Sequence, residues 1–313
     1  MSSGRAVGLL LGVAADAVLG DPKRGHPVAA FGRTAQRAES VTYRDSRSAG
    51  VLHTAGLVGA TVGLGVISQR MVRRSPVAEA TLTALTTWSV LGGASLAREG
   101  SAMAAHLDSG ELAAARSRLR GLCGRRADDL DNQGLARATV ESVAENTSDA
   151  VIAPLFWGAL AGVPGLVGYR AANTLDAMIG NRSSRYRAFG WGAARLDDLL
   201  NLLPARTTAM LTVVCAPVVG GSARESGRIR RRDASAHPSP NAGQVEAAFA
   251  GALRIRLGGR IDYEHAAETR PVLGEGRTAD GGDVTRSVEL SRLIGTVGGA
   301  LAAVTALVAG RRR

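Results

Sequence analysis

Apolar and polar stretches alternate along the whole chain, and the apolar stretches are long. Six apolar runs stand out, at residues 6–20, 51–69, 77–97, 150–169, 204–221 and 293–310. Several approach the ~20 apolar residues that a helix needs to cross a bilayer. A soluble helical core is the alternative, but helices around such a core normally carry charges on an outer face. The pattern therefore predicts an all-α fold, a polytopic membrane helix bundle.

The fourth run differs from the others because Val163, Pro164 and Gly165 interrupt it. We expect residues 150–178 to form a broken or re-entrant helix pair around Pro164, which enters the bilayer and returns on the same side. Non-helical backbone is tolerated at membrane depth only where protein surrounds it. The interruption would therefore return the polar residues of its second half to the side from which the first half started.

Two polar segments separate the apolar runs, at residues 98–139 and 223–289. The first has the periodicity of amphipathic helices with a turn at residues 121–124. In the second, residues 258–283 are rich in Gly, Asp and Glu and predict a loop. No internal repeat divides the chain, so residues 1–313 are expected to form a single membrane-embedded domain. The arginines at 311–313 favour a C-terminus inside the cell.

Composition narrows the possible partners. The formal net charge is +11, and Lys23 is the only lysine among the basic residues. Only 4% of the residues are aromatic and no nucleic-acid reader motif is present, which argues against nucleic acid and favours phosphate or anionic lipid. The 40 glycines suit close helix packing in lipid. Cys123 and Cys215 have no metal-ligand spacing, and P-loop, serine hydrolase and zincin motifs are absent from the sequence.

Carboxylates recur at every fourth position in ESVAENTSD, at Glu141, Glu145 and Asp149. On a helix they would line one face, and like charges at this spacing repel one another unless a positive charge stands opposite. Either arginines or a bound magnesium ion would provide that charge. Further along, Asn173 and Asp176 lie one helical turn apart and precede a cluster of arginines.

Other polar residues have the chemistry to bind phosphate or carboxylate groups. Arginine forks and amides suit these oxygens, and a helix start after Ser239 offers a further anion site. A compact turn also brings Asp21, Lys23 and His26 together after the first apolar run. The candidates for substrate or phosphate binding are Asp21, Lys23, Asn146, Asn173, Arg182, Arg185, Arg187, Arg195, Asp197, Asp198, Ser239, Asn241 and Glu246.

Four motifs together resemble one family. They are GDPKRGHPVAAFGR from residue 20, ESVAENTSDAVIAPLFW from residue 141, NTLDAMIG from residue 173 with RYRAFGWGAARLDDLLN from residue 185, and HPSPNAGQVEAAFAGAL from residue 237. In this order they are similar to the CobD/CbiB family of cobalamin biosynthesis, the membrane-embedded adenosylcobinamide-phosphate synthases.

The resemblance implies a multi-pass protein of the bacterial inner membrane. Its reaction would join the propionate carboxylate of adenosylcobyric acid to aminopropanol or its O-phosphate, with ATP and Mg²⁺. No permanently bound cofactor is expected, because the corrinoid is a substrate. Glu141, Glu145, Asp149 and Asp176 would hold the metal, and His26 or one of these carboxylates would accept a proton.

A transporter or membrane binding protein for a corrinoid or another anion is the alternative. Broken helices and buried charges shape the substrate path in many transporters, and the interruption at Pro164 fits that class. Against it, such transporters often consist of paired halves, and this sequence shows no repeat.

Overall fold

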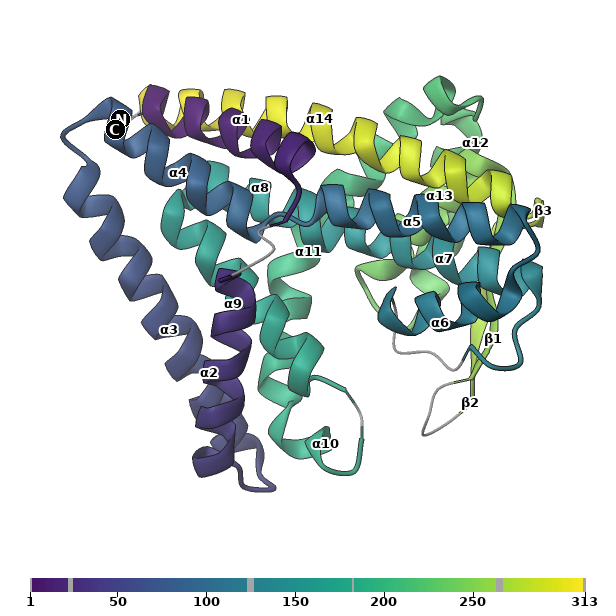
Figure 1. Cartoon of the computed structure of the whole chain (residues 1–313), viewed down its shortest axis with the longest axis horizontal. Helices are drawn as coiled ribbons and strands as arrows, with labels where there is room; N and C mark the ends of the chain where they lie inside the picture. The colour runs from purple at the N-terminus through teal and green to yellow at the C-terminus, as the bar shows by residue number, and fades with distance from the viewer. Residues whose placement is uncertain (1, 22–24, 123–126, 182, 263–266, 312–313) are drawn as a thin grey trace. The chain divides into compact units, whose positions relative to one another are not determined.

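The computed structural model describes residues 2–21, 25–122, 127–181, 183–262 and 267–311 (Figure 1). The chain forms two compact units, each assembled from separated segments. Unit 1 comprises Met1–Gly92, Asp149–Asn201 and Gly298–Arg313, and unit 2 comprises Gly93–Ser148 and Leu202–Val297. Helices dominate both units, which confirms the all-α prediction in its main point.

In unit 1, α1 (Ser2–Leu19) packs along α4 (Pro76–Val90) through a row of glycines. A Cβ atom placed on Gly8 would lie 2.5 Å from that of Thr83, and one placed on Gly12 would also collide with α4. Small residues spaced four apart let two helix backbones approach closely, a type of packing common inside membranes. The row therefore explains why this pair of helices docks.

The remaining helices of unit 1 surround a small apolar core. They are α2 (Pro27–Thr42), α3 (Arg47–Val72), the π-helix η1 (Ser148–Ile152), α8 (Ala153–Ala161), α9 (Val163–Ile179), α10 (Tyr186–Phe189), the first part of α11 (Trp191–Cys215) and the end of α14 (Gly281–Arg311). Phe189 is fully buried in this core and packs against Leu175 and Ile179 of α9. The core fixes α9 against the chain that follows it.

The interruption in the fourth run lies at Gly162, between α8 and α9. Gly162 has φ 70° and ψ −144°, a conformation that residues with a side chain rarely adopt. Pro164 lies in the first turn of α9, where its missing N–H is no loss. The Val163 N–H donates instead to Gln69 Oε1 of α3 at 2.9 Å. The expected pair of short helices is therefore present, with its break just before the predicted residues.

Unit 2 has a buried helix at its centre. In α13 (Ala242–Leu253) every residue from Val245 to Leu253 is buried, so this part of the predicted polar segment 223–289 is core. The surrounding elements are α5 (Gly93–Asp108), α6 (Leu112–Leu122), α7 (Asn132–Thr147), the last part of α11, η2 (Ala216–Val219), α12 (Ala223–Asp233), η3 (Ala234–Ala236) and the first part of α14. Helices α5, α6 and α7 confirm the amphipathic prediction for residues 98–139, although residues 123 and 124 of its turn lie outside the described residues.

A three-stranded sheet completes unit 2, and the prediction of a loop at residues 258–283 is wrong there. Strand β1 (Ile255–Asp262) lies between β2 (Ala267–Leu273) and β3 (Arg277–Thr278). It pairs antiparallel with β2 and parallel with β3. The glycines that suggested a loop lie within β1, where Gly258 and Gly259 have φ of 82° and 89° and accompany a shift in register. Such a bulge accommodates glycine inside a strand.

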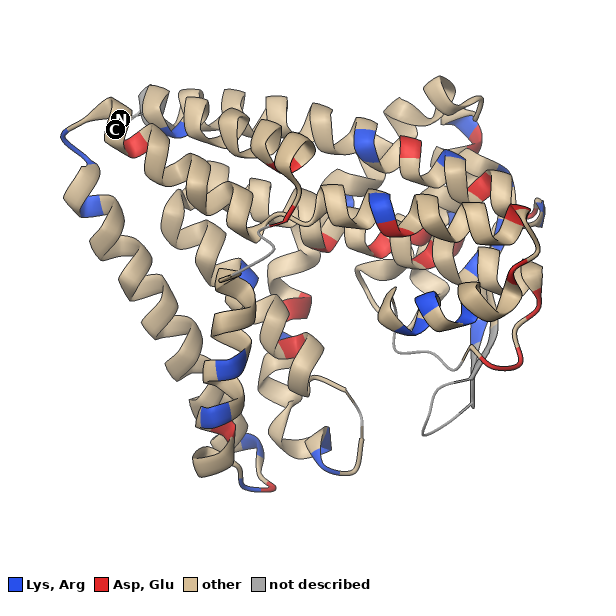
Figure 2. Ribbon diagram, in the orientation of Figure 1, with Lys and Arg blue, Asp and Glu red and all other residues tan. Residues whose placement is uncertain are grey.

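Three helical segments are long and apolar enough to cross a membrane: Arg47–Val72, Trp191–Val219 and Gly281–Ala309. The first has charged residues only near its ends, as Figure 2 shows for α3. Only 22% of its most apolar window is buried within the protein, so most of that apolar surface is available to lipid. The other three apolar runs are divided among shorter helices, which include α1, α4, α8 and α9.

Candidate functional site

Predicted site residues gather in two polar clusters, one in each unit. The cluster of unit 1, here the Asp197 cluster, consists of Tyr169, Asn173, Asp176, Asp197 and Asn201 from α9 and α11. Asp197 accepts hydrogen bonds from Asn173 Nδ2 at 3.3 Å and from Asn201 Nδ2 at 3.0 Å. The Tyr169 hydroxyl donates to Asn201 Oδ1 at 2.9 Å. These bonds satisfy a carboxylate that is only 9% exposed.

Asp176 adds a second carboxylate to the Asp197 cluster. Burial raises the pKa of Asp176 to about 7, with further contributions from the negative charges of Asp197 and Asp198. A Cβ atom on Gly180 would collide with Asp176 Oδ1, so the glycine of NTLDAMIG makes room for this side chain. Neighbouring carboxylates that resist joint ionisation suit a shared proton or a bound cation.

Asp149 and Arg170 lie beside the Asp197 cluster. Asp149 belongs to the π-helix η1, and its carbonyl oxygen is 3.2 Å from the Tyr169 hydroxyl. π-Helical turns inside α-helices occur frequently at functional sites. Arg170 is the nearby cation, since the negative charges of both Asp21 and Asp149 act on it. The structure thus brings the predicted residues Asp21 and Asp149 together with a residue that we had not predicted.

The cluster of unit 2, here the Glu246 cluster, consists of Glu141, Glu145, His237, Glu246 and Arg270. Glu141 and Glu246 are fully buried, on α7 and α13 respectively. Glu141 Oε1 accepts a hydrogen bond from the Gly258 N–H at 2.6 Å. Glu246 Oε1 lies 3.7 Å from His237 Nε2 and 3.9 Å from Arg270 Nη1, distances too long for hydrogen bonds.

Glu246 is the least satisfied carboxylate of this cluster. Within the part of the chain that the structure describes, neither of its carboxylate oxygens has a hydrogen-bond donor. Burial raises the pKa of Glu246 well above its ordinary value, and the negative charges of Glu145 and Glu141 raise it further. A hydrogen bond to Glu145 becomes possible when one of the two carboxyls is protonated. The cluster is therefore built to receive either a proton or a cation.

His237 is held in a defined orientation beside Glu246. Its Nδ1 accepts a hydrogen bond from the Ser239 N–H at 3.0 Å, which leaves Nε2 directed toward Glu246 and Arg270. Burial lowers the pKa of His237, and the positive charge of Arg270 lowers it further. The imidazole is therefore neutral at pH 7, and because Nδ1 accepts a hydrogen bond the ring proton lies on Nε2, which faces Glu246.

The magnesium prediction fits the chemistry of the Glu246 cluster. Among the described residues, no three His, Cys, Asp or Glu side chains are positioned together to hold a metal ion. However, Mg²⁺ in phosphoryl-transfer sites is commonly held by one or two carboxylates together with substrate phosphates. The unsatisfied oxygens of Glu246, next to Glu145, provide ligands of that type. The ligand set predicted from the sequence stays a prediction.

Several other predicted site residues have local structural contacts. His26 caps α2, since its Nδ1 accepts a hydrogen bond from the Val28 N–H at 3.2 Å. Arg185 pairs with Glu39 at 2.9 Å, whereas Arg187 is exposed.

The remaining candidates are similarly placed. Asn146 Nδ2 donates to the Ser142 carbonyl at 2.9 Å, and Arg195 pairs with Asp198 at 3.6 Å. The Ser239 hydroxyl accepts from the N–H groups of Asn241 and Ala242 at the start of α13. Lys23 and Arg182 lie outside the described residues.

Sequence reasoning missed four members of these clusters, Tyr169, Asn201, His237 and Arg270, and also Arg170 beside the Asp197 cluster. Helical spacing offered a signal for Tyr169, which lies four residues before Asn173 on the same face. His237 is the first residue of the motif HPSPNAG, and its position in that motif was a signal that could have identified it. Arg270 carried no signal, because it lies on a strand in a segment predicted as a loop.

Fold and clusters together define a helical membrane protein with buried carboxylates arranged for cation or proton chemistry. The family model of the CobD/Cbib protein matches residues 9–291. The chain belongs to the CobD/CbiB family.

Curated relatives cover nearly the same extent of the chain, and all three named here are called cobalamin biosynthesis protein CobD. One from Mycobacterium tuberculosis is 57% identical over 291 residues, which are 93% of this chain and 92% of the relative. One from Pelobacter propionicus is 40% identical over 279 residues, 87% of this chain and 86% of the relative. One from Rhodobacter capsulatus is 39% identical over 293 residues, 91% and 92% respectively. No solved structure matches this chain.

Proposed function

We propose that this protein is a biosynthetic enzyme of cobalamin assembly, an ATP-dependent ligase of the bacterial inner membrane. It joins the propionate carboxylate of adenosylcobyric acid to the amine of aminopropanol or its O-phosphate. The fully buried Glu246 carboxylate, unsatisfied beside Glu141 and Glu145, is the observation that carries the proposal. Family membership supports the cobalamin role, and the relatives bear the same assignment in their names.

Activation of the carboxylate comes first, because a carboxylate and an amine at neutral pH form an ion pair and no amide. The propionate oxygen attacks the γ-phosphorus of ATP and ADP leaves, which gives an acyl phosphate. The amine nitrogen then attacks the acyl carbon, inorganic phosphate leaves, and the nitrogen loses a proton. Phosphoryl transfer of this kind depends chiefly on positioning and charge stabilisation.

The residues of the Glu246 cluster have the chemistry for both steps. Glu145 and Glu246, with Glu141 beside them, would hold Mg²⁺, which neutralises phosphate charge when bound. Arg270 supplies a fixed positive charge next to that position. A carboxylate of the cluster accepts the proton that the amine releases, and His237 faces Glu246 with its Nε2–H. Metal ligation by Asp149 and Asp176 stays a prediction.

The decisive assay uses the purified protein in detergent with ATP, Mg²⁺, adenosylcobyric acid and either aminopropanol or its phosphate. We expect equal amounts of ADP and of an amide product. Binding of the corrinoid without ATP consumption and without amide would refute the ligase and favour a transporter or binding protein.

A substitution tests the role of the cluster. Glu246→Gln should reduce turnover by at least about 100-fold, as expected when charge stabilisation of a transition state is removed. The folded protein should persist, because glutamine preserves the shape of the buried carboxyl group. Glu289→Gln, an exposed position on α14, is the matched control and should retain activity. Wild-type turnover in Glu246→Gln would remove this residue from the reaction.

A further inference from the structure

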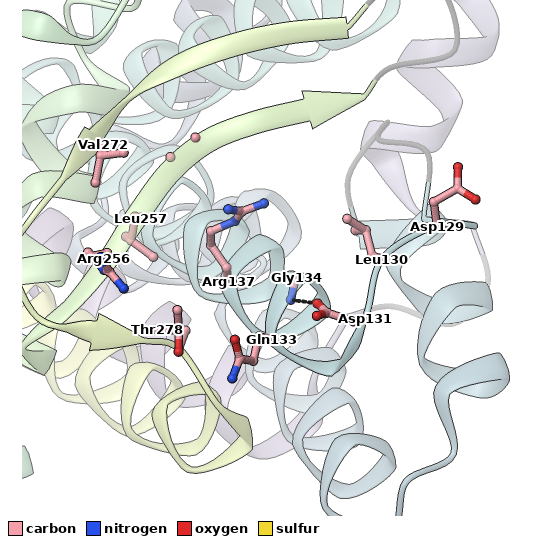
Figure 3. A pocket seen from close by; sticks show the side chains of 13 residues that line it. Asp129, Leu130, Asp131, Gln133, Gly134, Arg137, Arg256, Leu257, Val272 and Thr278 are labelled. Atoms are coloured by element: carbon pink, nitrogen blue, oxygen red, sulfur yellow. Dashed lines mark hydrogen bonds between the residues drawn. The ribbon is translucent and has the colours of Figure 1, made fainter.

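A cavity of about 550 Å³ lies within unit 2, beside the start of α7 and against the small sheet (Figure 3). Its wall includes Arg137 of α7, Arg256 and Gly258 of β1, and Thr278 of β3. This volume is in the range of sites that enclose a small organic molecule. The proposed reaction above does not use these side chains.

Two arginines give the cavity its positive character. Arg137 lies on α7 and Arg256 lies on β1 (Figure 3). Both side chains line the cavity. Arg256 is exposed to solvent, and it forms no ion pair with the carboxylates described in the structure. Guanidinium groups bind phosphate oxygens in pairs of parallel hydrogen bonds. A phosphate group is therefore a suitable ligand for this end.

The opposite end of the cavity is acidic. Asp129 and Asp131 lie there, before and at the start of α7 (Figure 3). Asp131 accepts a hydrogen bond from the Gly134 N–H at 2.8 Å and so caps the helix, while Asp129 is exposed. Carboxylates repel phosphate but accept hydrogen bonds from hydroxyl and ammonium groups. The ligand that fits both ends carries a phosphate at one side and hydroxyl or amine donors at the other.

The cavity adjoins the Glu246 cluster through a single glycine. Gly258 lines the cavity, and its N–H donates to the buried Glu141 at 2.6 Å. Its φ of 82° lets the strand bulge at this point, and a Cβ atom there would collide with the Pro271 carbonyl. A ligand in the cavity would therefore be separated from the carboxylates of the Glu246 cluster by the peptide group of Gly258.

We propose that this cavity binds a phosphate ester, with the phosphate at Arg137 and Arg256 and its donor groups toward Asp129 and Asp131. Two reactants of the proposed ligase have this chemistry: the nucleotide, and the phosphorylated amino alcohol. The choice of these two compounds depends on the proposed function, whereas the inference that the ligand is a phosphate ester depends only on the residues that line the cavity.

Calorimetric titration of the full-length protein in detergent tests the site. The ligands are ATP with Mg²⁺, aminopropanol O-phosphate, and aminopropanol without phosphate. The variants are Arg256→Gln and Arg137→Gln, with Arg224→Gln, exposed on α12 and outside the cavity, as the control. Thermal unfolding of each variant verifies that the fold is retained, and Arg256→Gln is the decisive variant because its side chain is exposed.

We expect the wild type to bind at least one of the two phosphate compounds. Its affinity should fall tenfold or more in Arg256→Gln and remain unchanged in Arg224→Gln. Loss for ATP alone or for the amino alcohol phosphate alone supports the site and identifies its ligand. Equal affinities in wild type and Arg256→Gln would overturn the proposal, and so would the absence of binding by the wild type. Because these titrations need no turnover, they remain informative even if the ligase assay fails.

Discussion

Gly162→Ala tests whether one residue sets the break between α8 and α9. Its φ of 70° and ψ of −144° lie close to a region occupied almost only by glycine, where a side chain adds about 1–3 kcal/mol of strain. The new Cβ would also lie 2.5 Å from Gln69 Oε1, the acceptor of the Val163 N–H. Loss of that hydrogen bond adds about 1 kcal/mol. We expect the free energy of unfolding to fall by about 2–4 kcal/mol in total.

The assay is reversible unfolding of the purified protein in mixed detergent micelles, followed by circular dichroism. Gly110→Ala is the first control, because Gly110 also has a positive φ of 73° but nothing lies within 4 Å of an added Cβ. Gln69→Ala is the second and removes only the acceptor. We expect Gly162→Ala to exceed both controls. If it destabilises the protein no more than Gly110→Ala, the close contact with Gln69 has no energetic role and the reasoning fails.

Two further predictions concern proton linkage and the core. The pKa of Glu246 is raised on folding, so the folded protein binds more protons than the unfolded chain above pH 4.5 and loses stability as pH rises toward the folded-state pKa. His237, whose pKa is lowered, has the opposite effect, and that effect ends at about pH 6.5. Mg²⁺ competes with the proton on Glu246, so the increase in Tm produced by Mg²⁺ should be larger at pH 8 than at pH 7, and this difference should disappear in Glu246→Gln. Phe189→Ala removes a fully buried ring and should lower the free energy of unfolding by about 3–5 kcal/mol in a denaturant titration. The control is the same change at the exposed Trp191, which should lower the free energy of unfolding by less. Equal effects of the two substitutions would contradict a packed core at Phe189.

The helices were predictable because apolar length is a local property of the sequence. The position of the break was predicted less well, since proline is tolerated in the first turn of a helix and Gly162 carries the unusual backbone. The sheet was missed for a different reason. Its glycines indicated a loop, and only pairing with β2 and β3, which no local pattern reveals, makes Ile255–Asp262 a strand.

The candidate site was predictable to a similar degree. The four-residue spacing identified Glu141 and Glu145, but Arg270 joins them from a segment more than 120 residues away, and no spacing rule covers that separation. The predicted roles of His26 and Arg185 stay predictions, although the structure gives both residues local contacts. Their residue types suit phosphate chemistry, yet one caps α2 and the other pairs with Glu39. Residue type alone does not distinguish a cap or an ion pair from a ligand.

The glycine row between α1 and α4 also has a practical consequence for extraction of the protein. Because a Cβ atom at Gly8 or Gly12 would collide with α4, the contact between the two helices consists of close van der Waals packing. This packing does not depend on the exclusion of water, so it persists when detergent replaces lipid. During solubilisation, α1 and α4 should therefore stay associated while pairs held only by bulky apolar side chains exchange those contacts for detergent.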